Sequence, residues 1–450
     1  MKLHLIDIVK EEPMLKKIES EIEDAITLKA LVFISFRLGL AIAVLIIEYI
    51  LAQRAELFAK NGPDCLCLEC GTLMNSKGFR PRTMNTLLGK IRWERQLRRC
   101  PKGCKSSHIA PFDDELGIQP YQKYSNELKQ MACILAIFVP YNIAASLLES
   151  LTGIEINHVT IWNWVQCIGK QAVMKLDAEL ENLNNGNNPE EEGIEPEVAL
   201  LPMLIGGDGV MVPFRPVRGT AEGKTVWKEV KVGIIARITH KTTKKGKEIS
   251  VTVRRRLTAV LGNINEFQSR LWLTSLKEGV LSAGTIVWLS DGGRGFWGLF
   301  NNLYSKCAQG VLDFFHAAQN LWKGAKAMFD GRTKKAHGWF KKARHNLRLG
   351  DAEKVLDEIE INSKNLPEDA EKISKNLVIY LKEHENHIKY DKYKESGLPI
   401  GSGMVESACK WLIQQRFKCV GMRWSENGFN HLLHLRLLWV NGEYDDFFEP

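Results

Sequence analysis

The sequence has too few cysteines for a disulfide-stabilised fold: ten in 450 residues, five of them between Cys65 and Cys104. Sparse but clustered cysteines are more typical of a metal site than of a disulfide framework. No internal repeat is visible, and the N-terminal stretch MKLHLIDIVKEEPMLKK has no apolar core followed by a small-residue cleavage site. We therefore expect a cytoplasmic protein with reduced cysteines.

The composition is that of an ordinary globular protein, since hydrophobic residues make up 45% and charged residues 25% of the chain. These values exclude collagen-like and disordered classes. A chain of this length exceeds one ordinary core, and about two to four domains are expected. The net charge is +8, although acids are concentrated in EEPMLKKIESEIED and NNPEEEGIEPE. The remainder is more basic, which suits a polyanion such as nucleic acid without requiring one.

One long apolar stretch, residues 30–52, approaches the roughly 20 residues that span a bilayer. Arg37 and Glu48 interrupt it, and such charges are costly inside a membrane. We therefore expect a buried or self-associating helix and consider membrane association less favoured. A membrane anchor is the alternative.

The hydrophobic pattern changes several times along the chain. Residues 1–60 are predicted to be helical, and 61–115 to form short strands around the cysteines. Residues 116–181 contain two short helices joined by a glycine turn, as in a helix-turn-helix. The acidic, Asn-rich segment 182–197 indicates a linker, and apolar strands alternating with helices from 198 onward indicate a mixed α/β domain. The expected fold class is therefore multidomain α+β.

The clustered cysteines form two pairs. Cys67 and Cys70 are spaced C-x-x-C, and Cys100 and Cys104 are spaced C-x-x-x-C. Two such thiolate pairs predict a structural, tetrahedral Zn²⁺ site in a zinc-ribbon-like module. Cys65 in place of Cys67, or His108 in place of Cys104, remains open.

Three acids stand where carboxylates are unusual. Asp208 interrupts an apolar strand in LIGGDGVMV, and Asp291 ends a second strand in TIVWLSDGG. Glu406 lies just inside a helix that begins after the turn Gly401 to Gly403, with Ser402 as its expected cap. Each aspartate alone could simply bond its own turn, and Glu406 could form a surface ion pair. Brought together, the three would bind Mg²⁺ or Mn²⁺ and support chemistry at phosphorus.

Four sequence blocks carry a resemblance to a known group: GGDGVMVPFR, LSDGGRGFW, VLDFFHAAQNLW and PIGSGMVESACKWLIQQRFKCVGMRWSENG. They resemble the signature blocks of the DDE transposases of bacterial insertion sequences, specifically the ISKra-four family, and more distantly the Mutator-like group. The resemblance implies a ribonuclease H-like core over 198–320 and 397–450, interrupted by a helical insertion over 321–396. It also implies that Asp208, Asp291 and Glu406 are the metal-binding triad. His316 would be an auxiliary group that positions a phosphate or water, and Asp313 is a weaker candidate.

Basic and polar side chains near these motifs are candidates for contact with DNA. Beside the glutamate they are Lys410, Arg416, Lys418 and Arg423; in the helix-turn-helix, Thr160 and Asn163 would reach bases or phosphates. Trp424 could stack on a base or belong to the core.

The sequence therefore predicts a DNA transposase of an insertion sequence. It would bind terminal inverted repeats, cleave DNA strands and transfer them to target DNA as a homodimer or larger assembly at the nucleoid. The alternatives are a DNA-binding regulator with an inactive ribonuclease H-like domain and a metal-dependent nuclease that only hydrolyses DNA.

Overall fold

The computed structural model describes residues 21–22, 26–104, 108–216, 223, 225–244, 246, 248–364 and 366–448. The chain divides into two compact units, Met1–Trp164 and Val165–Pro450. The first twenty residues of the predicted N-terminal helical region lie outside the described residues.

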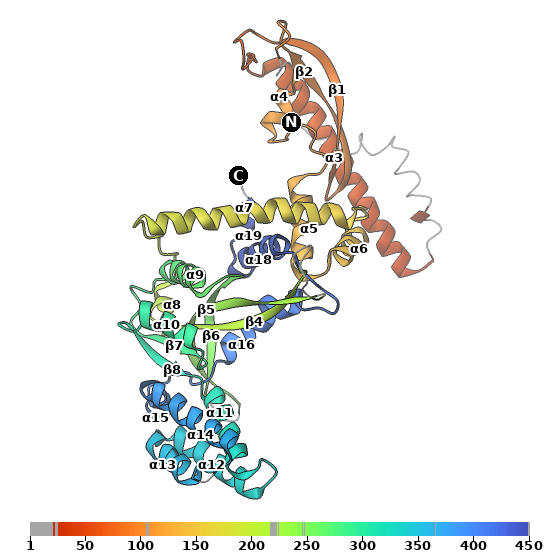
Figure 1. The fold of residues 1–450 in the computed structure, drawn as a ribbon. Helices are drawn as coiled ribbons and strands as arrows, with labels where there is room; N and C mark the ends of the chain where they lie inside the picture. The colour runs from red at the N-terminus through yellow and green to blue at the C-terminus, as the bar shows by residue number, and fades with distance from the viewer. Residues whose placement is uncertain are drawn as a thin grey trace. The chain divides into compact units, whose positions relative to one another are not determined.

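The first unit contains a long helix, α3 (Leu28–Asn61), which runs beside a β-hairpin (Figure 1). Thr27 caps its N-terminus by accepting a hydrogen bond from a backbone N–H of the first turn. Leu51 and Ala55 in its second half are buried against the hairpin, whereas Phe33 in the first half is 57% exposed. The predicted apolar helix is present. By length and composition alone it is also long and apolar enough to cross a membrane.

The hairpin belongs to a small antiparallel sheet of order β1-β2-β3. Its strands are β1 (Asn75–Thr86), β2 (Gly89–Arg99) and β3 (His108–Ile109). On β2, Ile91 and Trp93 alternate with exposed residues and pack toward α3, which is the pattern of a half-buried strand. Strands beside the cysteines are therefore present, but β1 and β2, with 12 and 11 residues, are longer than the short strands predicted.

Helices complete the first unit and lead into the second. They are α4 (Pro111–Glu115), α5 (Asn126–Phe138), α6 (Tyr141–Thr152) and α7 (His158–Asn184). Helix α6 ends at Gly153, whose φ of 72° lies in the left-handed region that glycine adopts without strain. The predicted pair of helices joined through a glycine turn is present.

The second unit is organised around a five-stranded sheet of order β6-β5-β4-β7-β8. The strands are β4 (Met203–Phe214), β5 (Val226–Thr242), β6 (Glu248–Val260), β7 (Ile286–Ser290) and β8 (Ala308–Leu312). The central strand β4 is antiparallel to β5 and parallel to β7, and β7 is parallel to β8. The sequence did not predict β8, because five residues with a single β-branched side chain give little strand signal.

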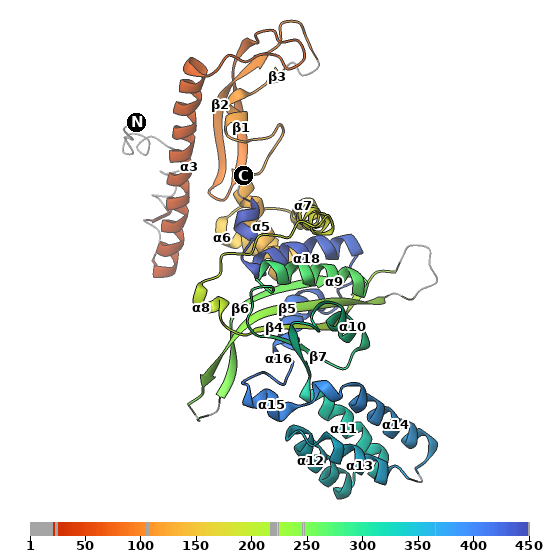
Figure 2. The same ribbon diagram turned by 90° about the vertical axis from the view of Figure 1, so that its left-hand side faces the viewer.

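Helices lie on both faces of this sheet (Figure 2). Two glycines of β4 show which helix covers which face. A Cβ added at Gly207 would lie 3.3 Å from Phe267 of α9 (Ile264–Lys277), and one added at Gly206 would lie 2.7 Å from Val405 of α16 (Gly403–Cys409). Because neighbouring strand residues face opposite sides, α9 and α16 cover opposite faces. The helices on and around the sheet are α8 (Pro196–Ala199), α9 (Ile264–Lys277), α10 (Arg294–Leu303), α16 (Gly403–Cys409), the π-helical turn η2 (Lys410–Gln414), α17 (Gln415–Phe417), α18 (Glu426–Asn441) and α19 (Tyr444–Phe448).

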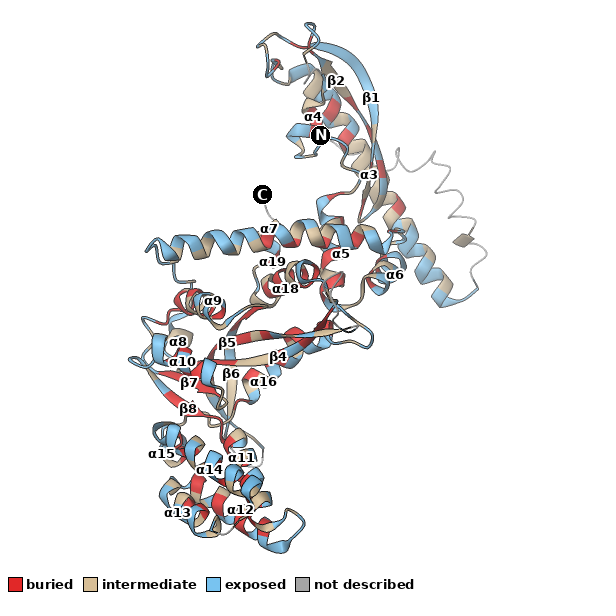
Figure 3. Ribbon diagram, in the orientation of Figure 1, coloured by how far each residue is buried: buried red, intermediate tan, exposed pale blue. Residues whose placement is uncertain are grey.

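A group of helices stands between β8 and α16. It contains α11 (Phe314–Phe329), α12 (Lys334–Arg348), α13 (Ala352–Asn362), α14 (Glu368–Glu383), η1 (Glu385–His387) and α15 (Tyr390–Glu395). Leu321, Leu347 and Leu381 are buried positions of these helices, and Figure 3 shows buried residues within the group. Helix α11 begins at residue 314, so the helical group starts slightly before the predicted insertion.

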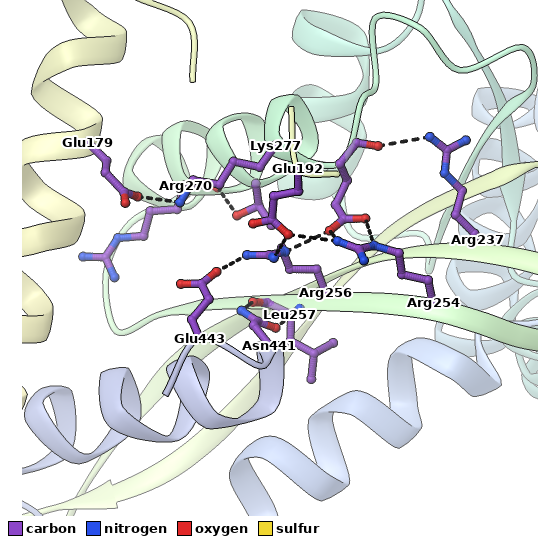
Figure 4. A network of polar contacts seen from close by, with 12 residues as sticks. Glu179, Glu192, Arg237, Arg254, Arg256, Leu257, Arg270, Lys277, Asn441 and Glu443 are labelled. Atoms are coloured by element: carbon purple, nitrogen blue, oxygen red, sulfur yellow. Dashed lines mark hydrogen bonds and ion pairs between the residues drawn. The ribbon is translucent and has the colours of Figure 1, made fainter. Parts of the chain in front are cut away.

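Buried charges tie the predicted linker to the sheet (Figure 4). Glu278, 2% exposed, accepts hydrogen bonds from Arg254 and Arg256 of β6 at 2.8 to 2.9 Å. Glu192, in the predicted linker, pairs with the same two arginines, and Glu443 also pairs with Arg256. The linker is therefore held against the domain by ion pairs.

Replacing Glu278 with Gln should lower the free energy of unfolding by about 3 kcal/mol, because Glu278 is buried and the change removes a charged partner from the buried Arg256 and the half-buried Arg254. Burial alone would raise the pKa of Glu278, but Arg254 and Arg256 lower it below its usual value. The stability that the ionised Glu278 contributes is therefore complete above about pH 4.5 and is lost as the pH falls through its lowered pKa. Urea unfolding at pH 7 measures the loss. Glu371→Gln, which breaks an exposed pair with Lys375, should cost less than about 0.5 kcal/mol; equal losses would contradict the prediction.

Candidate active site and cysteine cluster

Asp208 lies within β4, the central strand. Its Oδ1 accepts a hydrogen bond from the N–H of Gly209 at 2.7 Å. Its Oδ2 lies 3.8 Å from Sγ of Cys409, a buried thiol at the end of α16. The second carboxylate oxygen therefore faces the helix that also carries Glu406.

Asp291 directly follows β7. The parallel register places Gly207 opposite Ser290. The next residues, Asp208 within β4 and Asp291 after β7, therefore lie at the same level of the sheet. Asp291 Oδ1 accepts the N–H of Gly293 at 3.0 Å, which fixes the turn. The local alternative, an aspartate that bonds its own turn, is thus observed for Asp291, whereas Asp208 accepts the next N–H within its strand; each of these bonds uses only Oδ1.

Glu406 lies in the first turn of α16, and its N–H donates to the carbonyl oxygen of Ser402 at 2.9 Å. Its neighbour Val405 packs closely on Gly206, which brings α16 against β4. Glu406 Oε2 also lies 3.8 Å from Lys410 Nζ in an exposed pair. Such a pair contributes little, so it does not account for the position of Glu406.

Both other acids affect the pKa of Asp208. Burial raises the pKa of Asp208, and the charges of Asp291 and Glu406 raise it further. The Gly209 N–H and His316 act in the opposite direction. Mutual repulsion among carboxylates is relieved by a bound cation, and oxygen ligands suit Mg²⁺ or Mn²⁺. The three acids do not form a closed cluster of ligand atoms: in the described part of the chain, only four cysteines place such atoms within 4.8 Å of one another.

Asp313 joins the elements that carry these acids. It is fully buried and caps α11, with Oδ1 accepting the N–H of His316 at 2.7 Å. Its Oδ2 accepts the N–H of Ser402, and its own N–H donates to the carbonyl oxygen of Ser290 at 2.9 Å. Burial opposes ionisation, but the hydrogen bonds from His316 and Ser402 lower the pKa of Asp313 to about 2.

The expected side-chain cap of α16 is not formed. Ser402 occupies the N-cap position, yet its hydroxyl makes no capping hydrogen bond. Its backbone N–H is held by Asp313 instead, so the turn before Glu406 is fixed from outside the helix.

His316 lies beside the acids and is half-buried. Its Nδ1 is 3.4 Å from Asp313 Oδ1, an ion-pair distance if the ring is protonated. The pKa of His316 is raised first by Asp313 and then by the charges of Asp291 and Asp208. It can therefore carry a positive charge or donate a proton beside the carboxylates.

The basic residues beside Glu406 are not equivalent. Lys410, Lys418 and Arg423 are exposed. Arg416 is 1% exposed, and its guanidinium lies 5.2 Å from the ring centroid of Trp424. The side chain of Arg416 is therefore packed inside the domain, and its contact with DNA stays a prediction that this burial does not favour.

Trp424 is anchored by hydrogen bonds on both sides. Its Nε1 donates to the carbonyl oxygen of Phe417 at 3.0 Å, and its backbone bonds Pro213 and Arg215 at 3.1 and 2.8 Å. It is half-buried and serves the packing of the domain. In the first unit, Asn163 is exposed on α7 and Thr160 is half-buried.

The four cysteines of the two predicted pairs come together. Ligand atoms of Cys67, Cys70, Cys100 and Cys104 all lie within 4.8 Å of one another, and Cys70 Sγ is 3.6 Å from Cys100 Sγ. Hydrogen bonds from Thr72 lower the pKa of the Cys70 thiol to about 6. Four converging sulfurs suit tetrahedral Zn²⁺ and leave no open position for catalysis.

The two alternative ligands fall outside this cluster. Cys65 Sγ donates to the carbonyl oxygen of Pro63 at 3.5 Å, and His108 lies on β3. The predicted set of four cysteines is therefore the one that could bind Zn²⁺.

Comparison with known proteins gives one distant relative in sequence. The chain is 25% identical over 386 residues to a protein of Streptococcus gallolyticus described as "UPF0236 protein in vanSb 3'region", covering 82% of this chain and 74% of that protein. No family model matches. A solved structure, the Drosophila P element transposase strand transfer complex, aligns over 74% of this chain and 82% of its own, at 12% identity and a TM-score of 0.25. A score this low supports no structural argument.

Sequence reasoning missed two contributors to the site. Cys409 was not singled out, although it lies three residues after Glu406 and so shares its helical face. Asp313 was considered only as a weak candidate, and an aspartate directly before the helical segment FFHAAQ is a recognisable N-cap signal. Its bond to Ser402 had no local signal, because 89 residues separate the two.

Asp313→Asn should lower the pKa of His316, since Asp313 is the main group that raises it. Titration of the His316 ring by NMR measures this change. Asp291→Asn, which removes a smaller contribution, should lower the pKa less. A larger effect from Asp291→Asn would contradict the order of interactions described above.

Purified protein should contain about one Zn²⁺ per chain, as four cysteines form one site. Cys70→Ala should lose the metal and unfold the cysteine module at lower temperature. Cys65→Ala serves as the matched control and should keep the metal, because Cys65 lies outside the cluster. Elemental analysis by mass spectrometry distinguishes these outcomes, and metal loss from both variants would argue against the assignment.

Proposed function

We propose that this protein is a transposase of the DDE type, with Asp208, Asp291 and Glu406 as its metal-binding acids. The observation that carries the proposal is geometric: the parallel register sets Asp208 beside Asp291, and the packing of Val405 on Gly206 brings the helix of Glu406 against the same strand. The three acids come from the central strand, the adjacent parallel strand and the helix packed on them. This arrangement supports the ribonuclease H-like core implied by the sequence blocks.

The chemistry would take place at phosphodiester bonds. With Mg²⁺ or Mn²⁺ held by the three acids, the ions would stabilise charge on the attacking and leaving oxygens. Water would attack phosphorus and break the bond to the 3′-oxygen, which leaves a 3′-hydroxyl and a 5′-phosphate. That 3′-hydroxyl would then attack a target phosphodiester, forming a bond from its oxygen to phosphorus and breaking the bond to the 3′-oxygen of the target strand, which leaves as a hydroxyl. His316 would position a phosphate or exchange a proton beside Asp208.

The other parts would recognise DNA. The α6–α7 helix pair, with Asn163 exposed and Thr160 half-buried, would act as a helix-turn-helix on the terminal inverted repeats. Lys410, Lys418 and Arg423 would contact phosphates, and the cysteine module with Zn²⁺ would support this binding. Two DNA ends must be paired, so a homodimer or larger assembly at the nucleoid follows. The exposed first half of α3 is a candidate for self-association.

Two alternative functions share these features. A regulator would use the helix pair and cysteine module without chemistry at the acids. A nuclease would use the acids to hydrolyse DNA without joining strands. The observation that favours an inactive site is that the three acids do not form a closed cluster of ligand atoms in the described part of the chain.

Asp208→Asn should abolish Mg²⁺-dependent cleavage and joining of labelled inverted-repeat ends, with DNA affinity changed less than about threefold. It removes a metal ligand but no basic contact. Asp351→Asn, an exposed acid paired with Lys354, is the control and should keep full activity. Wild-type protein that binds but never cleaves would support the regulator, and cleavage without joining would support the nuclease.

A further inference from the structure

A groove of about 580 Å³ lies between α11 and α12. Three of its lining residues are aromatic, Phe315, Trp322 and Phe340, and three are basic, Lys323, Lys326 and Arg344. No function described above uses this groove.

Its aromatic wall is arranged around Trp322. The ring centroid of Trp322 lies 5.3 Å from that of Phe340 and 4.8 Å from that of His337, which lines the same groove. Trp322 is only half-buried, and Phe315 is 54% exposed. Aromatic faces are therefore accessible to a planar ligand.

The charge of the groove has one sign. No acidic residue lines it, and Lys323, Lys326 and Arg344 have no carboxylate partner within 4.0 Å among the residues that the structure describes. Lys323 Nζ bonds only the amide oxygen of Asn320, at 3.1 Å. An anionic partner could form ion pairs with these three cations, whereas an apolar partner would gain nothing from them.

The groove lies beside the candidate active site. Phe315 directly precedes His316, and a Cβ at Gly401 would lie 2.7 Å from the Phe315 ring. Gly401 belongs to the turn before α16, the helix that carries Glu406. One wall of the groove is therefore in contact with the turn that positions a catalytic candidate.

We propose that the α11–α12 groove binds an unpaired nucleotide of the DNA substrate. The base would stack on Trp322, and the basic residues would contact the adjacent phosphates. Bases inside a duplex are stacked on their neighbours, so an unpaired base is the one that offers its face to an aromatic side chain. This inference rests on the proposed function, because it takes the DNA at Asp208, Asp291 and Glu406 as its ligand.

The test compares full-length protein with a labelled duplex that has a single-stranded 3′ extension and with the same duplex made blunt. Fluorescence anisotropy is measured without added Mg²⁺ or Mn²⁺, so that no strand is cut while Zn²⁺ stays bound to the cysteine module. Trp322→Leu should weaken binding of the extended duplex about 5- to 100-fold and leave the blunt duplex unchanged, since stacking is lost while apolar volume is kept. Trp322→Phe, which keeps an aromatic face, should retain most of the affinity.

Two variants that each remove one positive charge provide the second comparison. Lys326→Gln should weaken binding of the extended duplex and reduce its salt dependence by about one phosphate contact. Lys341→Gln removes the same charge from an exposed position on α12 outside the groove and should have a smaller effect.

Equal affinity of wild type and Trp322→Leu for the extended duplex would overturn the inference, as would tighter binding of an RNA extension of the same sequence. Because the assay contains no Mg²⁺ or Mn²⁺ and measures no cleavage, failure here leaves the proposed chemistry untouched. Conversely, if the groove variants weaken binding but the wild-type protein never joins strands, the groove inference stands and only the transposase proposal is contradicted.

Discussion

The hydrogen bond from the Ser402 N–H to Asp313 is the constraint on which the candidate site depends. Asp313 also bonds the end of β7 through Ser290 and caps α11, so one buried carboxylate connects a strand, a helix and the turn before Glu406. An ionised group in that position requires partners for its oxygens, and each oxygen has one. The low pKa of Asp313, about 2, keeps this connection ionised across the physiological range.

Strand pairing supplies the rest of the geometry. The parallel register of β4 and β7 sets Asp208 and Asp291 at one level, and the approach of Val405 to Gly206 sets α16 against β4. A side chain at that glycine would push the helix away, so the small residue is a condition for the acids to share one region. The raised pKa of Asp208 follows from that closeness and from burial.

Much of this arrangement could be predicted from sequence, but not all. Long apolar strands, the cysteine pairs and Asp208 in an apolar run have strong local patterns, and these elements are present in the structure. Strand β8 was missed because it is short. Arg416 was expected on the surface because helical spacing was counted on a straight helix, whereas the π-helical turn η2 intervenes and the side chain packs against Trp424. Contacts between distant segments, such as Asp313 with Ser402, leave no local signal.

The ion pairs of Arg254 and Arg256 with Glu192 and Glu278, of which only Arg256 with Glu278 is buried on both sides, have a practical consequence. Mobile ions screen charges in water far more effectively than charges shielded by protein. Concentrated salt that screens the exposed lysines should leave the internal pair of Arg256 with Glu278 nearly intact. The second unit should therefore stay folded at salt concentrations that screen its surface charges.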